Sequence, residues 1–139
     1  MDIEEIYNFL ETSQGVSRSK LSPKADLYSD LGIDGDDFFE LAEDFASKYN
    51  VSMKTYCWYF HHKEEGFNIG ALFSPAPYQQ VERIQITPEV LLLAATTKTW
   101  PISYPEHKIN SRRTESLINK VFIITLLGIT AICVLSAFA

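Results

Sequence analysis

The sequence predicts a mainly α-helical protein, in which a small helical bundle is followed by a single C-terminal transmembrane helix. Three segments carry apolar residues at helical spacing, and they begin near residues 3, 35 and 88. The last segment, residues 121–139, contains no charged side chain. At about 1.5 Å rise per residue, a helix of this length is close to the ~30 Å hydrocarbon core of a bilayer.

The first helix is predicted from its cap and its periodicity. Asp2 stands at the N-cap position, and Glu5 follows at the spacing of a capping box. Gly15 is expected to end the helix, because glycine adopts the left-handed conformation of a C-cap without strain. One face of the helix is apolar, at positions i, i+3, i+4 and i+7: Ile3, Ile6, Tyr7 and Leu10.

A loop rich in Ser, Lys and Pro is predicted for residues 15–30, with Leu27 and Leu31 as its anchors in the core. The second helix is expected to follow Asp34 and to stop at Asn50. Its apolar stripe would consist of Phe38, Leu41, Ala42, Phe45 and Tyr49.

The other side of this second helix is acidic. Residues 26–44 hold eight acidic side chains and no basic one, and residues 1–50 hold 12 acidic and four basic side chains, a net charge of −8. Such a surface argues against nucleic acid as a partner, because binding to phosphates requires Lys and Arg. It favours a protein partner with a basic surface. The candidate partner-binding residues are Asp36, Asp37, Glu40, Glu43 and Asp44.

The chain between the second and third helices is harder to assign. It has too many aromatic residues for a solvated loop, so part of it is expected to pack: Tyr56, Trp58, Tyr59, Phe60, Phe67 and Phe73. Residues 81–86 are predicted to form a short extended piece. Thr87 then caps a third helix with Pro88 in its first position, which is expected to run through residues 89–100 and to end at Pro101.

The predicted domains are a globular domain at 1–104, a basic juxtamembrane linker at 105–120 and a transmembrane helix at 121–139. Arg112, Arg113 and Lys120 precede the apolar segment and nothing positive follows it, so the positive-inside rule places the N-terminal domain in the cytoplasm. The N-terminus lacks the features of a signal peptide, which agrees with this tail-anchored arrangement.

Cys57 and Cys133 are expected to stay reduced and not to pair, since Cys133 lies within the apolar segment.

No pattern typical of catalysis is present, so we expect neither an enzyme nor a cofactor. A calcium loop fails in both possible frames, because Gly32 takes the third position in one and Phe39 takes the sixth in the other. His61, His62 and Glu65 could in principle bind a metal ion. Adjacent histidines followed by a lysine are more typical of a solvated turn, which is the expectation here.

The stretch Leu31-Gly32-Ile33-Asp34-Gly35-Asp36 resembles the site at which acyl carrier proteins hold their prosthetic group. In that family a serine follows the aspartate and a leucine follows the serine. Here Gly35 stands in the place of the serine, and Asp36 in that of the leucine. Without a hydroxyl group at residue 35, the resemblance implies loss of phosphopantetheine attachment. Ser29 is nearby but precedes the turn.

The chain more closely resembles a bacterial family of acyl-carrier-like proteins of unknown function. The shared pattern is D-L-G-x-D-G-D-D at 30–37, Tyr59-Phe60, Glu65-Gly66 and a final helix that ends in Trp100. The resemblance covers residues 1–104, and the HHKE segment at 61–64 departs from it.

The resemblance implies an acyl-carrier-like fold and a non-enzymatic role at the bacterial inner membrane. The acidic helix would bind a basic-surfaced partner, for which fatty-acid or lipid-modifying enzymes are the implied class. Three alternatives remain open: a functional acyl carrier with another attachment residue, a metal-dependent enzyme that uses His61 and His62, or an acidic run that is only a solvated face.

Overall fold

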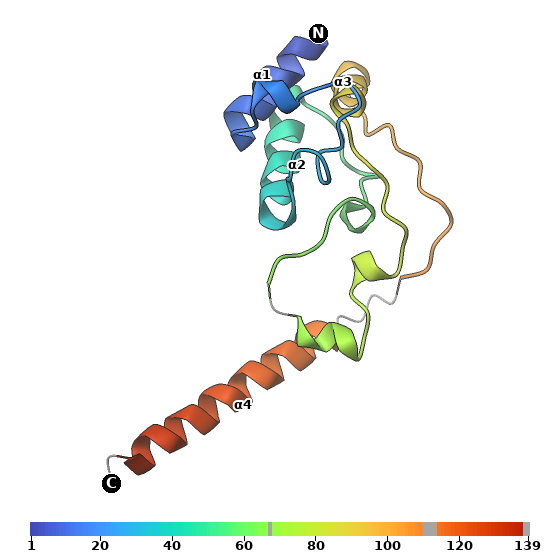
Figure 1. Cartoon of the computed structure of the whole chain (residues 1–139). Helices are drawn as coiled ribbons and strands as arrows, with labels where there is room; N and C mark the ends of the chain where they lie inside the picture. Colours follow the sequence, from blue (N-terminus) through green and yellow to red (C-terminus); the bar gives the residue numbers. More distant parts are fainter. Residues whose placement is uncertain (67, 110–113, 138–139) are drawn as a thin grey trace. The chain divides into compact units, whose positions relative to one another are not determined.

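The computed structural model of the chain describes residues 1–66, 68–109 and 114–137, and it confirms the predicted mainly helical class (Figure 1). The α-helices are α1 (Ile3–Gln14), α2 (Gly35–Tyr49), α3 (Pro88–Thr97) and α4 (Thr114–Ala137). Short 3-10 helices connect them: η1 (Arg18–Lys20), η2 (Trp58–Phe60), η3 (Ile69–Leu72) and η4 (Pro77–Gln79). Among the described residues, β pairing is limited to one isolated bridge, between Ser52 and Thr99.

The chain divides into two compact units. One, the three-helix unit, consists of Met1–Glu65 and Val81–His107. The other, the α4 unit, consists of Gly66–Gln80 and Lys108–Ala139. Residues 66–80 therefore group with α4, although they lie inside the predicted 1–104 domain.

Helix α1 begins and ends as predicted. The Asp2 carboxylate accepts a hydrogen bond from the backbone N–H of Glu5 at 3.1 Å. Gly15 adopts φ +63° and donates its N–H to the carbonyl of Glu11. Both ends of the helix thus have partners for backbone groups that a helix leaves unsatisfied.

Helix α2 buries the predicted stripe. Phe38, Leu41, Phe45 and Tyr49 are buried and Ala42 is half-buried, while Leu27 and Leu31 of the preceding loop are buried as expected. Asn50 ends the helix in the left-handed conformation, with φ +51°.

Helix α3 starts as predicted but ends earlier. Thr87 caps the backbone N–H of Val90, and Pro88 occupies the first turn. The helix stops at Thr97 rather than near Trp100, because Lys98 turns left-handed at φ +61°. The backbone then pairs with Ser52, whose N–H donates to Lys98 and whose carbonyl accepts from Trp100. This tertiary pairing competes with the last helical turn.

Residues 81–86 form no strand and instead bond singly to two neighbours. The Ile84 N–H donates to Phe60 at 2.6 Å, and the Ile86 carbonyl accepts from Leu27 at 2.9 Å. The segment thereby links the aromatic turn η2 to the loop before α2.

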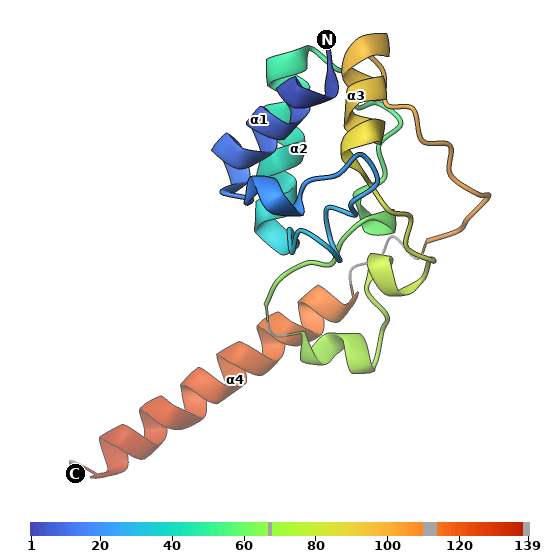
Figure 2. The same ribbon diagram turned by 45° about the horizontal axis from the view of Figure 1, so that its top comes forward.

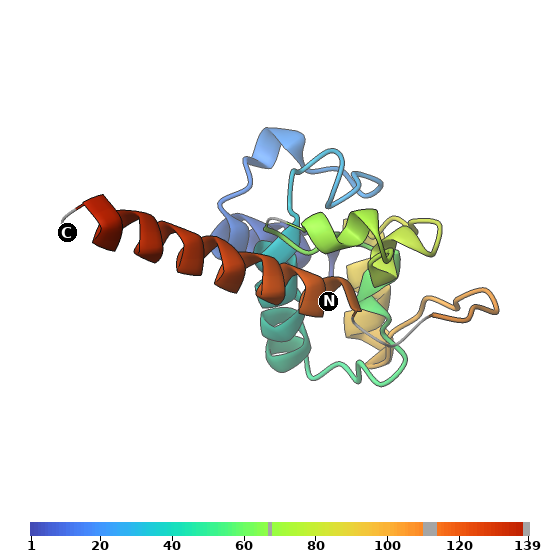
Figure 3. The same cartoon turned by 90° about the horizontal axis from the view of Figure 1, so that it is seen from below.

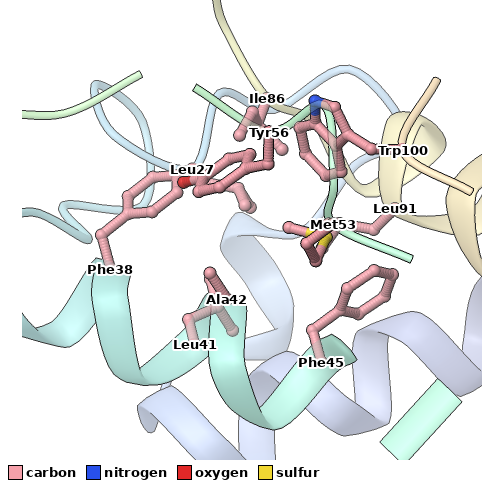
Figure 4. A pocket seen from close by; sticks show the side chains of 10 residues that line it. All are labelled: Leu27, Phe38, Leu41, Ala42, Phe45, Met53, Tyr56, Ile86, Leu91 and Trp100. Carbon is pink, nitrogen blue, oxygen red and sulfur yellow. The ribbon is translucent and has the colours of Figure 1, made fainter. Parts of the chain in front are cut away.

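The core of the three-helix unit lies between α1, α2 and α3, which Figures 1 and 2 show gathered together. Figure 4 shows side chains from α2, α3 and the intervening loops around one small apolar cavity of about 10 Å³. That volume corresponds to about one water-sized probe, so the core is close-packed. The lining residues are Leu27, Phe38, Leu41, Ala42, Phe45, Met53, Tyr56, Ile86, Leu91 and Trp100.

Only some of the aromatic side chains in residues 56–73 are packed. Phe60 is buried, and Tyr56, Trp58 and Tyr59 are half-buried. Phe73 was a candidate for packing, but its side chain is 75% exposed. Phe67, the remaining aromatic candidate, lies outside the described residues.

Helix α4 is long and apolar enough to span a membrane over Thr114–Val134, and none of its apolar window is buried. Figure 3 shows it as one uninterrupted helix. It begins at Thr114, so residues 114–120 of the predicted linker are helical. Arg112 and Arg113 lie outside the described residues, and the orientation that they imply stays a prediction.

Phe45→Ala should lower the free energy of unfolding by about 3–5 kcal/mol, because Phe45 is 1% exposed and packs against Phe9 and Tyr49. The full chain in detergent would be unfolded with denaturant. Fluorescence of Trp58 and Trp100 reports the three-helix unit, because both lie in it.

The exposed Glu43→Ala on the same helix is the control, expected within about 0.5 kcal/mol of the wild type. Equal stability of Phe45→Ala and wild type would contradict the assigned core.

Candidate functional site

The loop before α2 is organised by the first two acidic residues of the run. The carboxylate of Asp26 is buried and accepts hydrogen bonds from the Tyr28 N–H, from the Ser29 hydroxyl at 3.0 Å and from Arg83 at 2.5 Å. The carboxylate of Asp30 accepts the N–H of Asp26 at 2.8 Å. Both acids therefore accept hydrogen bonds within the loop, Asp26 from a buried position and Asp30 from an exposed one.

Ionisation of Asp26 is favoured despite its burial. Burial by itself raises the pKa of this carboxyl, but the hydrogen bonds from Arg83, Ser29 and the Tyr28 N–H outweigh it, so the pKa is lowered. The ion pair between the buried Asp26 and the exposed Arg83 holds the loop against residues 81–86.

The start of α2 requires glycine at residue 35. Gly35 is buried with φ +54°, a conformation that side chains with a Cβ rarely adopt. The side chain of Glu65 occupies the space that a Cβ at this residue would need. The position that resembles the carrier serine thus has no hydroxyl group and a backbone conformation that disfavours any side chain, so these residues do not fit a phosphopantetheine attachment site.

Residues 61–65 pack over the same helix start. Asp34 stands at the N-cap of α2, but its side chain makes no capping bond and instead accepts the backbone N–H of Lys63 at 3.0 Å. The ring of His62 stacks on Phe38, with centroids 4.6 Å apart and planes at 11°. His62 and Lys63 of the HHKE segment therefore contact the start of α2, and Glu65 lies over Gly35.

The expectation that His61 and His62 form a solvated turn is wrong, because both side chains are buried. Packing against aromatic rings accounts for the burial of His62, whose ring also contacts Phe39 edge-on, with ring centroids 4.6 Å apart. Burial lowers the pKa of His62.

His61 belongs to a hydrogen-bond network. Its Nδ1 lies 2.8 Å from the Ile84 carbonyl, which can only accept, so Nδ1 carries the proton. Its Nε2 then accepts from the Tyr104 hydroxyl at 2.7 Å. The same hydroxyl accepts from the indole N–H of Trp100 and from the backbone N–H of Cys57. Burial lowers the pKa of His61 to about 4, in agreement with this neutral tautomer.

The structure does not gather the proposed metal ligands. Both ring nitrogens of His61 have protein partners, His62 turns its Nδ1 to the Lys63 carbonyl, and Glu65 is exposed over Gly35. Within residues 1–66, 68–109 and 114–137, no three His, Cys, Asp or Glu side chains form a group that could hold a metal ion. Cys57 and Cys133 are both free.

The five candidate partner-binding residues are all exposed on α2. At about 100° per residue they lie within an arc of about 120°, opposite the buried stripe. In the described part of the chain none of these carboxylates has a hydrogen-bond or ion-pair partner. The residues are Asp36, Asp37, Glu40, Glu43 and Asp44.

An apolar groove borders this acidic face. Its floor comes from one side of α2 and from the segment after it, and Glu43 stands at its edge. The apolar lining residues are Phe39, Ala42, Ala46, Met53, Tyr56 and Trp58. The sequence predicts packing for Ala42, Tyr56 and Trp58 and makes no prediction for the other three, and all six side chains are half-buried.

Comparison with known proteins adds no assignment, since no family model matches the chain and no solved structure matches it. Asp26, Arg83 and Tyr104 are the residues that the sequence did not single out. Asp26 and Arg83 are 57 residues apart, and Tyr104 is 43 residues from His61, so no local spacing signals these contacts.

The stability of the three-helix unit should fall as the pH is lowered from about 6.5 toward 4. The folded-state pKa of His61 is depressed, so the unfolded chain takes up the proton first and is favoured as the pH falls. The shift corresponds to a loss of up to about 3 kcal/mol, measured by denaturant unfolding across this pH range. His61→Leu should be less stable at pH 7.5 but show a shallower pH profile; a wild type of constant stability would contradict the assignment.

Gly35→Ser should acquire little or no phosphopantetheine. The positive φ and the side chain of Glu65 both oppose a serine at this residue, and Asp36 places a charge where carriers have leucine. Wild type and variant would be co-expressed with a phosphopantetheinyl transferase and weighed intact by mass spectrometry. A known acyl carrier protein in the same cells is the positive control. Stoichiometric modification of either protein would revive the carrier alternative.

Proposed function

We propose that this protein is a non-enzymatic, membrane-anchored, acyl-carrier-like interaction module that presents the acidic face of α2 to a basic protein partner. The observation that carries the proposal is the set of five exposed carboxylates on α2 without partners among the described residues. The motif resemblance supports the acyl-carrier-like part, and α4 supports the anchor.

Repulsion between the carboxylates of the acidic face destabilises α2. Glu40 lies one turn from both Asp36 and Asp44, and like charges at this spacing destabilise a helix by about 0.2–0.5 kcal/mol per pair. Asp36 and Asp37 gain from the helix dipole in the first turn, but Glu43 and Asp44 lie beyond it. Lys or Arg side chains of a partner would relieve this repulsion.

The neighbouring groove supplies a second kind of contact. An apolar side chain of the partner would pack against Phe39 and Trp58, while a basic residue beside it would meet Glu43. An apolar centre with a charged rim is the usual anatomy of a protein interface. By resemblance, the partner class is fatty-acid or lipid-modifying enzymes, and the location is the cytoplasmic side of a bacterial inner membrane.

The carrier alternative has no comparable support. Ser29, the hydroxyl nearest the motif, already donates to the Asp26 carboxylate, and Gly35 offers no attachment atom.

Glu40→Lys/Glu43→Lys should abolish partner binding while leaving the fold intact. The detergent-solubilised chain would be used to capture proteins from host lysate at low and high salt, with circular dichroism as the check on folding. Wild-type binding should itself weaken with salt, because the Debye length falls from about 10 Å at 0.1 M to about 3 Å at 1 M.

The matched control is Glu82→Lys/Glu106→Lys, which makes the same charge change at two exposed residues of the same unit outside α2. It should retain the partners. If the α2 variant captures every protein that the wild type captures, the acidic run is only a solvated face.

A further inference from the structure

One side of the apolar groove beside the acidic face is a ridge of α2. The ridge consists of Phe39, Ala42, Glu43 and Ala46, which follow the i, i+3, i+4, i+7 spacing of a single helix face. At about 1.5 Å rise per residue, these positions cover roughly 10 Å, or two helical turns. The groove therefore extends along α2 for two turns.

The small side chains of this ridge allow another helix to come close to α2. Ala42 and Ala46 lie one turn apart, and both are half-buried. The distance between two packed helices depends on the side chains at their contact, so alanine at these positions permits a close approach. Ala42, Met53 and Tyr56 also line the cavity of Figure 4, so packing of the core holds these side chains in place.

The opposite side of the groove comes from a segment that is folded into turns. There the Tyr56 N–H donates to the Met53 carbonyl at 3.0 Å, and the Cys57 N–H donates to the Tyr104 hydroxyl at 3.2 Å. Ser52, just before them, is already paired with the chain that follows α3. An extended peptide therefore finds no strand in this segment with which to pair its backbone.

The occupant of the groove must then satisfy its own backbone hydrogen bonds. Glu43 is the one charged residue in the lining, and most of the lining side chains are apolar. An extended peptide would bury N–H and C=O groups against these apolar side chains, which costs free energy. An α-helix bonds the same groups internally, so that only its side chains need to match the groove.

The carboxylates of the acidic face are not equally close to the groove. At about 100° per residue, Glu43 borders the ridge and Asp36 and Glu40 come next, whereas Asp37 and Asp44 lie toward the far side of the arc. A helix in the groove would therefore meet carboxylates along one of its two flanks. Lys or Arg side chains on that flank would make the contact electrostatically complementary.

Charge also decides between the possible occupants of the groove. Anionic lipid headgroups attract basic segments and would be repelled by this row of carboxylates. The whole chain carries a net charge of −6, and a second copy bound through the same groove by a two-fold axis would bring two acidic faces together. A basic helix of another protein meets neither repulsion.

We propose that the partner's binding element is an amphipathic α-helix that lies along α2 in this groove. Its apolar residues pack against Phe39 and Trp58, and a row of Lys or Arg residues on one flank meets Glu40 and Glu43. This inference rests on the proposed function and names the element that the acidic face binds. The apolar contacts hold the helix in the groove, and the ion pairs fix which of its flanks faces the acidic side of α2.

The test uses a synthetic peptide of about 18 residues, which is long enough to form a helix. Its leucines repeat at i, i+3, i+4 and i+7, lysines follow one flank, and alanine fills the other positions. One control peptide has the same composition in scrambled order. The other control is the same helix with glutamate in place of lysine.

The full chain in nonionic detergent would carry photo-methionine, a diazirine analogue, in place of its two methionines, Met1 and Met53. Met53 lies in the groove, while Met1 is 52% exposed and is not among the lining residues, so it is the internal control. After irradiation, mass spectrometry should locate the amphipathic peptide at residue 53 and not at residue 1. Both control peptides should give at least about tenfold less adduct at residue 53, which corresponds to about 1.4 kcal/mol of binding free energy.

Two charge-reversal variants test the position of the helix. Glu40→Lys/Glu43→Lys should reduce the adduct at residue 53 by at least about tenfold. Asp37→Lys/Asp44→Lys makes the same charge change on the far side of the acidic face and should reduce the adduct less. Circular dichroism confirms that each variant is folded.

Two further variants provide a steric test and a control. Ala46→Phe fills the groove and should abolish the adduct. Glu82→Lys/Glu106→Lys, at exposed residues outside the groove, should leave the adduct unchanged.

Equal adducts from the amphipathic and scrambled peptides, adducts at residue 1 as strong as those at residue 53, or adducts at residue 53 with another copy of the chain would overturn the inference. An absent adduct at residue 53, with lysate capture that still depends on Glu40 and Glu43, overturns the inference but leaves the proposed function standing. Lysate capture that does not depend on these two residues rejects the proposed function, and the inference with it.

Discussion

The hydroxyl group of Tyr104 is the contact on which the arrangement of the three-helix unit depends. The hydroxyl group donates to His61 and accepts from the indole N–H of Trp100 and the backbone N–H of Cys57. It therefore joins the segment that follows α3 to the segment around η2. The Nδ1–H of His61 in turn donates to the carbonyl of Ile84. A buried polar network of this kind specifies one arrangement, because each broken bond would leave a buried group unsatisfied at a cost of about 1–3 kcal/mol.

That arrangement decides what the start of α2 can do. With His61 fixed, His62 stacks on Phe38, Lys63 bonds to Asp34 and Glu65 covers Gly35. In an acyl carrier this position must be open to a modifying enzyme. In this chain residue 35 is a buried glycine with φ +54°, and the side chain of Glu65 lies beside it.

The outward side of α2 is the part of this helix that stays exposed. The buried stripe and the covered first turn leave the acidic arc and its bordering groove as the free surface of this helix. Only Asp36 and Asp37 lie in the first turn, where the helix dipole favours an acidic side chain, and the core packs from the opposite side of the helix. Under the proposed function, a partner of opposite charge would bind this cluster.

The sequence by itself determined the helical class, the caps at Asp2, Gly15, Asn50 and Thr87, the buried stripe of α2, and a final helix long and apolar enough to span a membrane. These features are local, because helical periodicity and capping depend on residues a few positions apart. The tertiary structure decided the early end of α3, the burial of His61 and His62, the Asp26–Arg83 pair and the hydrogen bond between Gly70 of η3 and Asn119 of α4. Each of these depends on contacts between residues distant in the chain. The acidic face depends on both the sequence and the tertiary structure. Helical periodicity places its carboxylates on one side of α2, and the packing of the core leaves that side exposed.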